Sequence, residues 1–364
     1  MRAVLWPWLV LVLMGTAVCS LAKTSRRARP SAPPRRPAHE TTYPGFGSRT
    51  TGGSGRPVLT VRTLADSGPG SLRAALAMAA RGGGTIRFSI AGGIMLVSGL
   101  DVPGHTTIDG SSAPPPGITF WGQHAGARGT GIINIADTDV VIRGLRIRNG
   151  MNDGVHIAPR NGHPVANVAV DHCSITNNAD GGIDITGYKG IPVSDVTIIG
   201  NYLAGNGGPC PKGWCGGASL MSYGADRVSY YYNVWDKNLR RTPSVTGAGR
   251  VADVRYNVVR SPEQGGIQIR AGARANVVGN VLEGPKATVA AKLWGGHAYV
   301  EGNPSDLGAR GDIAKPLPVP NLPAAKSAAE VMAGAGASRP DVVDAYYRDT
   351  ATTFAQVREK AFAR

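Results

Sequence analysis

Aromatic side chains are scarce in this sequence, at 6% of 364 residues, whereas glycine occurs 51 times. Such a composition favours many short strands joined by tight turns over a bundle of helices. From about residue 85 onward, short strand-like runs follow one another without helical segments between them. A TIM barrel needs those helices and is therefore excluded.

Long apolar runs are also rare. The main one, "AVLWPWLVLVLMGTAV", follows Arg2 and is too short for a comfortable membrane span. Small residues in "SLA" offer a cleavage point, so we expect residues 1–22 to be a signal peptide and the mature protein to be secreted, extracellular or periplasmic. A lipidated Cys19 is a weaker alternative, because Val18 is a poor neighbour for it.

Acidic residues are outnumbered, with 24 Asp and Glu against 39 Lys and Arg and a formal net charge of +15. Residues 1–56 hold nine of the basic residues and one Glu, so about half of the net charge lies there. Residues 23–56 are rich in Arg, Pro, Ser, Thr and Gly, which predicts a disordered basic linker. The remainder is still basic, which favours an anionic polymer as partner, although mild basicity also aids solubility.

The chain has only four cysteines. Cys19 would leave with the signal peptide. Cys210 and Cys215, in "CPKGWC", could close a small loop as a disulfide in an exported protein. Cys173 lies in a strand-like run and is interpreted as a buried apolar residue.

A repeat is present in the strand region. Asn201, Asn233, Asn257 and Asn280 each follow an apolar alternation, at spacings of 32, 24 and 23 residues. This period is typical of a β-helix, in which each coil stacks on the last, and a β-sandwich lacks it. We therefore predict an all-β fold, a parallel β-helix over residues 57–303. A short helix from about Ser71 to Ala80 would cap its N-terminal end, and a partly helical extension, residues 304–364, would pack on it.

Several motifs together resemble the pectate lyase family of right-handed parallel β-helices, from about Val61 to the C-terminal region. Members of that family cleave polygalacturonate by β-elimination, usually with calcium. The motifs are "GSLRAAL", "TIDG", "VIRGLRIRNG", "VDHCSIT", "DGGID", "NVWDKNLRRTP" and "AGAGASRPDVVD".

The resemblance implies site residues. The calcium-binding acids of the family fall on Asp153, Asp180 and Asp184, and its catalytic base on Arg241. Asp180 and Asp184 are an even number of residues apart, so in an extended strand they share a face, and calcium prefers such oxygen ligands. Asp171 and His172 match a family motif associated with the architecture of the coil. Without the resemblance, Asp180 and Asp184 would be interpreted as turn formers and Arg241 as a solvated surface cation.

The sequence also departs from the family. Met151 stands where a further acid is expected, and Thr246 where a second Arg is expected, with Arg250 nearby. The substrate-binding Lys of the family falls near Gly217, so that charge is missing. We expect other cations to replace it in contacting substrate: Lys212, Lys237, Arg240 and Arg250.

The expected protein is thus a secreted, monomeric polyuronate lyase that uses Ca²⁺ and binds an acidic polysaccharide, with no nucleic-acid partner and no stable membrane span. Two other functions stay open. One is a non-catalytic β-helix that binds polysaccharide. The other is an inverting polygalacturonase, which needs two carboxyl groups with room for water between them and lacks an adjacent Asp pair here.

Overall fold

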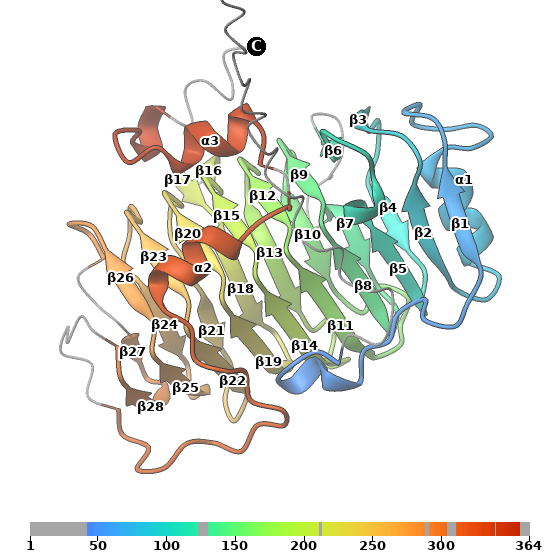
Figure 1. The fold of residues 1–364 in the computed structure, drawn as a ribbon. Coiled ribbons are helices and arrows are strands. Elements are labelled where there is room, and N and C mark those ends of the chain that lie inside the picture. The colour runs from blue at the N-terminus through green and yellow to red at the C-terminus, as the bar shows by residue number, and fades with distance from the viewer. Residues whose placement is uncertain are drawn as a thin grey trace, which may run out of the picture. The chain divides into compact units, whose positions relative to one another are not determined.

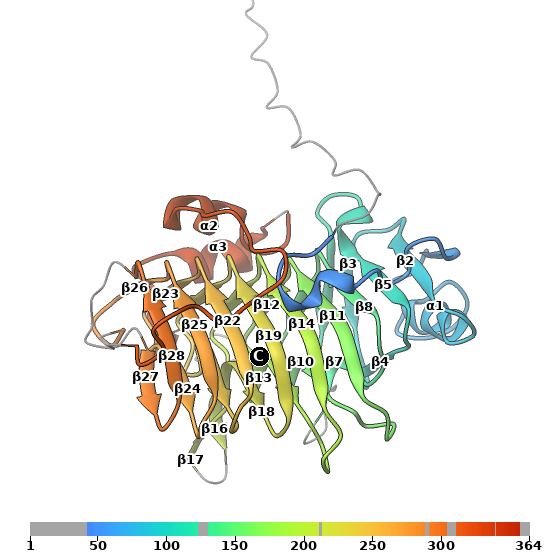
Figure 2. The ribbon, with the colours of Figure 1, turned by 90° about the horizontal axis from the view of Figure 1, so that it is seen from below.

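The computed structural model describes residues 42–122, 130–210, 213–287, 291–303, 311–338 and 340–356. Within them the chain winds through three parallel sheets, which we call A, B and C, and contributes one strand to each sheet per coil (Figures 1 and 2). The predicted parallel β-helix is confirmed. The predicted signal peptide, residues 1–22, lies outside the described residues.

Sheet A holds the longest strands. It comprises β1 (Val58–Val61), β2 (Gly84–Phe88), β5 (Thr106–Asp109), β8 (Val140–Arg143), β11 (Val165–Asp171), β14 (Val193–Ile199), β19 (Ala225–Tyr231), β22 (Val251–Arg255), β25 (Arg274–Val278) and β28 (His297–Glu301).

Sheet B holds short strands, and sheet C carries the site described below. Sheet B comprises β3 (Gly92–Met95), β6 (Ile118–Trp121), β9 (Arg146–Arg148), β12 (Ser174–Thr176), β15 (Tyr202–Ala204), β20 (Val234–Asp236), β23 (Val258–Arg260) and β26 (Val281–Glu283). Sheet C comprises β4 (Leu100–Val102), β7 (Gly131–Ile135), β10 (Asp153–Ile157), β13 (Gly181–Thr186), β18 (Gly217–Ser222), β21 (Ser244–Thr246), β24 (Ile267–Arg270) and β27 (Ala291–Trp294). A separate antiparallel hairpin is formed by β16 (Gly208–Cys210) and β17 (Gly213–Cys215).

Every second residue of a strand points into the coil. Val196 and Ile198 of β14 are paired in register with Val228 and Tyr230 of β19, and all four are fully buried. Because the register is kept from coil to coil, the interior is a stack of aliphatic rows that extends through the whole solenoid. This continuous core supplies most of the apolar burial that holds the strands together.

The repeated asparagines form a hydrogen-bonded ladder at the turn between sheets A and B. Asn233 Oδ1 accepts hydrogen bonds from Asn201 N and Nδ2, both at 3.0 Å. Asn257 Oδ1 accepts the corresponding two hydrogen bonds from Asn233. A second ladder, at the turn between sheets B and C, links Asn178, Asn206 and Asn238. The sequence alone did not predict this second ladder, because its three members recur over fewer coils than those of the first.

Both ends of the described chain are tied to the solenoid. Helix α1 (Leu72–Ala79) lies where a helix was predicted, the hydroxyl of its N-cap Ser71 accepts from Ala74 N, and the helix contacts β1 and β2. The extension forms α2 (Ala328–Gly334) and α3 (Val342–Arg348). Buried ion pairs anchor α3, since Arg148 of sheet B lies 2.7 Å from Asp344 and 2.8 Å from Asp341.

The predicted linker ends too late in the sequence. Residues 42–56 form a short 3₁₀ helix, η1 (Phe46–Arg49), and flanking turns that lie on sheet A. Phe46 N donates to Ser229 Oγ and Gly47 N to Thr197 Oγ1, both at 3.0 Å. The aromatic rings of Tyr43 and Phe46 are buried there, which is why this polar, glycine-rich stretch folds. The folded part therefore begins by residue 42 and not at residue 57.

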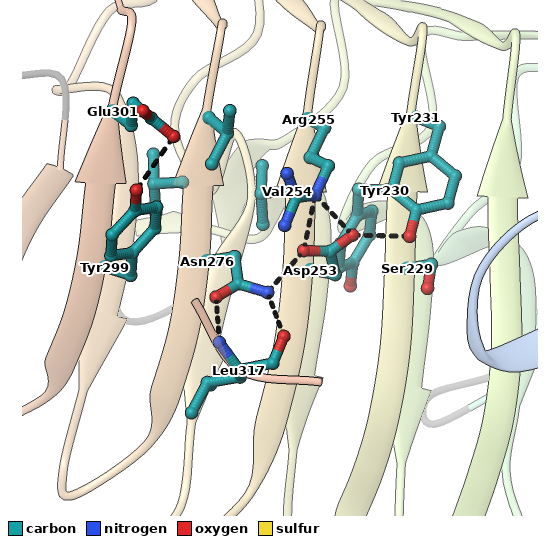
Figure 3. A network of polar contacts seen from close by, with 12 residues as sticks. Ser229, Tyr230, Tyr231, Asp253, Val254, Arg255, Asn276, Tyr299, Glu301 and Leu317 are labelled. Atoms are coloured by element: carbon teal, nitrogen blue, oxygen red, sulfur yellow. Dashed lines mark hydrogen bonds and ion pairs between the residues drawn. The ribbon is translucent and has the colours of Figure 1, made fainter. Parts of the chain in front are cut away.

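A segment of the C-terminal extension is held on the same face of sheet A. Asp253, on β22, accepts from Tyr231 Oη at 2.5 Å, from Arg255 Nε at 2.8 Å and from Asn276 Nδ2 at 2.7 Å (Figure 3). Asn276 in turn accepts from Leu317 N at 2.8 Å. This network fixes the start of the segment that leads to α2.

Candidate metal and catalytic site

Two of the predicted functional residues, Asp153 and Asp184, lie on neighbouring strands of sheet C. On β13, Ile183 and Ile185 point into the core, so Asp184 and Thr186 point outward. The parallel register places His156 of β10 and Leu220 of β18 beside Asp184. Residues that are 28 or more positions apart in sequence are therefore neighbours across the strands.

Asp153 and Asp184 converge over one glycine. Asp153 begins β10, is 2% exposed, and accepts a hydrogen bond from Gly181 N at 2.8 Å. A Cβ atom on Gly181 would lie 2.6 Å from Asp153 Oδ1 and 2.5 Å from Asp184 Oδ1. Any larger residue at position 181 would push the two carboxylates apart.

Burial makes this pair electrostatically costly. It raises the pKa of Asp153 to about 8, and the negative charge of Asp180 adds to that rise, against the opposing effect of the Gly181 N–H and Arg241. Burial, followed by the charge of Asp153, also raises the pKa of Asp184 well above its usual value. Within the described residues, Asp184 Oδ1 is buried without a hydrogen-bond partner. A cation between the two carboxylates would offset both the burial of their negative charges and the repulsion between them.

The donor set fits a divalent cation only in part. Calcium takes six to eight oxygen ligands, and no group of three or more His, Cys, Asp or Glu side chains in the described ranges is arranged to hold a metal. Asp180, the third predicted ligand, is directed toward the next coil, since a Cβ on Gly216 would lie 2.2 Å from its Oδ1. Two carboxylates can bind calcium if backbone oxygens, water or a substrate carboxylate complete the shell.

Arg241 reaches this pair from two coils farther along the helix. Its Nη1 lies 3.8 Å from Asp184 Oδ2, and its side chain is 23% exposed. Its backbone has a positive φ of 59°, and its carbonyl accepts a hydrogen bond from Ser219 N at 2.8 Å. The guanidinium thus lies beside Asp184 and is partly exposed to solvent.

Arg240 is the best-placed substitute for the missing Lys. A Cβ on Gly217 would lie 2.1 Å from the Arg240 carbonyl oxygen, so this backbone leaves no room for a lysine side chain there. Arg240 Nε donates to Gly216 O at 3.0 Å. Burial lowers the pKa of Arg240 and the neighbouring Arg241 lowers it further, whereas Asp180 opposes both effects. Its charge therefore lies next to the acids.

The other predicted substrate-binding residues lie elsewhere. Lys237 is 2% exposed, and its Nζ donates to the Tyr347 carbonyl at 2.6 Å under α3. The prediction that it contacts substrate is wrong, because a buried ammonium cannot reach a polymer. Arg250 lies in the turn between β21 and β22, at the opposite end of the strands from Arg241. Lys212 and the side chains of Cys210 and Cys215 lie outside the described part of the chain, so the disulfide stays a prediction.

His156 belongs to the site and the sequence analysis missed it. Its Nδ1 lies 3.0 Å from Asp153 Oδ2, and its Nε2 lies 3.1 Å from Thr186 Oγ1. Burial lowers its pKa, while Asp184 acts in the opposite direction. The alternation in "DGVHI" could have identified it, since apolar residues flank it on both sides.

Asp171 and His172 lie away from these acids, at the turn between sheets A and B. Asp171 is 4% exposed, contacts the His172 ring, and accepts from Tyr43 Oη at 3.3 Å. His172 has a positive φ of 48° and packs against Gly200 of the next coil. The pair braces a turn and holds the N-terminal segment. Cys173 beside it is fully buried, as expected, and burial raises the pKa of its thiol to about 12.

A family model described as "Right handed beta helix region" matches residues 130–304. A protein named probable pectate lyase C from Aspergillus flavus is 33% identical over 272 residues, which cover 71% of this chain and 58% of that protein. One of the same name from Emericella nidulans is 33% identical over 269 residues, covering 71% and 57%. The chain thus spans somewhat more than half the length of these curated relatives.

Solved structures share the fold at low identity. The structure of jun a 1, the major allergen from cedar pollen, aligns with a TM-score of 0.63 at 19% identity, over 81% of this chain and 92% of that one. A pectate lyase from Bacillus sp. N165 in complex with trigalacturonate aligns with a TM-score of 0.56 at 17% identity, over 81% and 98%.

Fold and site together define a right-handed parallel β-helix with a carboxylate and arginine site on one of its sheets. The resemblance found in the sequence motifs agrees with these findings, since the chain is similar to proteins named probable pectate lyase C and matches a right-handed β-helix model over residues 130–304. In the described residues no helix is long and apolar enough to cross a membrane.

Proposed function

We propose that this protein is a secreted polysaccharide lyase that cleaves polygalacturonate or a related polyuronate by calcium-assisted β-elimination. One observation carries the proposal. Asp153 and Asp184 converge over Gly181, and Arg241 lies 3.8 Å from Asp184, in a chain related to proteins named probable pectate lyases. The residues implied by the family thus come from three separate coils to one place.

Each side chain has a distinct role in the proposed reaction. Asp153 and Asp184 would hold the cation, with Asp180 next to them adding negative charge. Calcium, when bound, supplies positive charge that fixes a uronate carboxylate and acidifies the neighbouring C5–H bond. Arg240 would contact a substrate carboxylate, because guanidinium and carboxylate groups pair through two parallel hydrogen bonds.

Arg241 would take the C5 proton. The electron pair of the C5–H bond then forms a C4–C5 double bond, the C4–O bond breaks, and the departing sugar oxygen gains a proton. A free guanidinium stays protonated below about pH 12, so a base at this position needs nearby positive charge and desolvation to favour its neutral form. The neighbouring Arg240 supplies part of that positive charge, and a bound cation would supply more.

A non-catalytic polysaccharide-binding protein is the second candidate. The absence of a three-ligand metal group in the described residues and the departures at Met151 and Gly217 favour it. One assay separates the two. With polygalacturonate and calcium, a lyase produces near-ultraviolet absorbance from its unsaturated product, and a chelator stops this. Polymer binding without that product would support the second candidate.

A further inference from the structure

Exposed aromatic side chains gather at one edge of the solenoid. In the part of the chain that the structure describes, the large exposed apolar side chains include three aromatic ones: Tyr188 at 53%, Tyr223 at 79% and Trp294 at 39% exposure. All three follow or end strands of sheet C, namely β13, β18 and β27, where the chain turns toward sheet A. We call this line of turns the aromatic edge. Exposed aromatic groups that cluster on one face mark an interaction surface.

Cations accompany the rings. Lys189 Nζ lies 5.1 Å from the centre of the Tyr188 ring, and the Arg270 guanidinium carbon lies 4.3 Å from that of Trp294. Arg250 lies on the coil between Tyr223 and Arg270, in the turn after β21. Five successive coils, those of β13, β18, β21, β24 and β27, therefore each present an aromatic ring or a cation.

The backbone holds these residues in place. Tyr188 is fixed by a tight turn in which its N–H and carbonyl both bond to Ile191, at 3.0 and 2.9 Å. A Cβ on Gly187 would lie 2.2 Å from the Tyr223 carbonyl oxygen, so the two turns are in direct contact. Trp294 O accepts from Ala271 N at 2.9 Å. With strands about 4.8 Å apart, the row extends roughly 19 Å along the solenoid.

The charges favour an anionic occupant. The carboxylates of Asp195 and Asp226, at the start of the neighbouring sheet A strands, are paired with Arg227 at 2.6 and 3.9 Å. The edge thus combines flat apolar rings, which suit the faces of sugar rings, with cations, which suit carboxylates. Tyr188 lies beyond the end of β13, in the turn toward sheet A and four residues after Asp184, so the edge is separate from the carboxylate site.

We propose that the aromatic edge is a second binding surface for an acidic polysaccharide strand that lies along the solenoid, outside the carboxylate site. The polymer expected at the aromatic edge is of the same class as the substrate of the proposed function, and in this the inference rests on that function. Binding at the edge requires no bond cleavage. On this account the edge holds long chains near the enzyme, and short oligomers that fit the carboxylate site do not need it.

The test measures binding and turnover separately. The variant combines Tyr188→Ala, Tyr223→Ala and Trp294→Ala, and the control combines Met95→Ala, Leu322→Ala and Val342→Ala, which remove exposed apolar side chains elsewhere. Retention on immobilised polygalacturonate is measured with chelator present, so that no cleavage occurs. We expect about tenfold weaker retention for the aromatic variant, with the control and the melting temperature unchanged.

A second measurement follows cleavage of long polymer and of a uronate trimer. The aromatic variant should show a raised KM on the polymer, with unchanged kcat and an unchanged rate on the trimer. Equal retention of variant and wild type on the polymer would overturn the proposal. So would wild-type retention that is as strong on an uncharged polysaccharide, or concentration-dependent self-association that the aromatic variant abolishes. A protein without lyase activity that still binds through these rings would refute the proposed function and support the edge.

Discussion

Arg241 and Asp184 come from different coils and approach within 3.8 Å, and this contact was implied by a family resemblance and not by local sequence rules. Alternation along "DGGIDIT" does place Asp184 on the outer face. Nothing local shows that Asp180 is directed toward Gly216 in the next coil, or that Lys237 is buried under α3. Both outcomes depend on contacts between segments far apart in the sequence, which single-sequence patterns do not contain.

Replacing Arg241 tests the assigned base. In Arg241→Ala we expect lyase turnover to fall by roughly 100- to 10,000-fold, the usual contribution of a positioned base, with little change in melting temperature. Arg227→Ala is a matched control, because Arg227 is 46% exposed and pairs with Asp195 on another face. Turnover is followed by the absorbance of the unsaturated product. Equal losses in both variants would contradict the assignment.

Asp153→Asn tests the cost of the acidic pair. Because the pKa of Asp153 is raised to about 8 in the folded protein, ionising it opposes folding, and that penalty grows as the pH rises from about 4 to 8. In chelator at pH 8, the variant should therefore melt roughly 5 °C higher than wild type. Thermal unfolding checks this, together with the loss of any stabilisation by calcium.

Asp195→Asn is the control for Asp153→Asn, because folding shifts the pKa of Asp195 in the opposite direction. At Asp195, burial opposes ionisation, but hydrogen bonds from Arg227 and Ser194 outweigh it and lower the pKa. Asp195→Asn should therefore leave stability unchanged or reduce it at pH 8. A fall in melting temperature for Asp153→Asn would show that the carboxylate is stabilised by groups other than a bound cation.

At the scale of elements, the sequence predicted the coils well because their signal repeats. The asparagine period and the alternation of apolar residues mark the turns and inner faces directly, and Ser71 marks the start of α1. The N-terminal segment, residues 42–56, was misassigned because its composition is that of a linker. Its order comes from burying Tyr43 and Phe46 on sheet A, a surface that does not exist until the coils have stacked.

Interior members of the asparagine ladder should contribute more to the free energy of unfolding than the member at its end. In Asn233→Ala, the buried Asn201 N loses its acceptor and Asn201 Nδ2 loses one of its three acceptors. We expect a loss of about 2–3 kcal/mol in the free energy of unfolding. Asn303, whose Oδ1 accepts from Asn280 N at 2.7 Å, is the partly exposed end of the ladder, and Asn303→Ala should cost about 1 kcal/mol. Denaturant unfolding gives both values. Similar losses at the two positions would refute the view that interior members matter more.

For the whole molecule, several acids tie the terminal segments to the solenoid. Burial opposes ionisation of Asp139, but hydrogen bonds from Thr51, Gly52 and His105 outweigh it and lower its pKa. The pKa of Asp341, at α3, is also lowered, because bonds from Arg148 outweigh burial. A carboxylate whose pKa is lowered by folding stabilises the fold fully above about pH 4, its usual pKa. That stabilisation is lost as the pH falls through the lower pKa of the folded state.

Acid should therefore loosen both terminal segments. Below about pH 4 we expect residues 42–56 and 341–348 to lose protection from hydrogen exchange before the core strands of sheet A do. Asp139→Asn should remove protection of the N-terminal segment alone already at neutral pH. Loss of protection in the core before either segment would contradict this arrangement.

The most direct test of the central claim is the product formed from polygalacturonate by the full chain, with calcium and with chelator. We expect calcium-dependent growth of near-ultraviolet absorbance, matched by new reducing ends, and neither signal in chelator. Reducing ends without that absorbance would indicate hydrolysis, and binding without either signal would indicate a non-catalytic protein. Either result would contradict a lyase built on Asp153, Asp184 and Arg241.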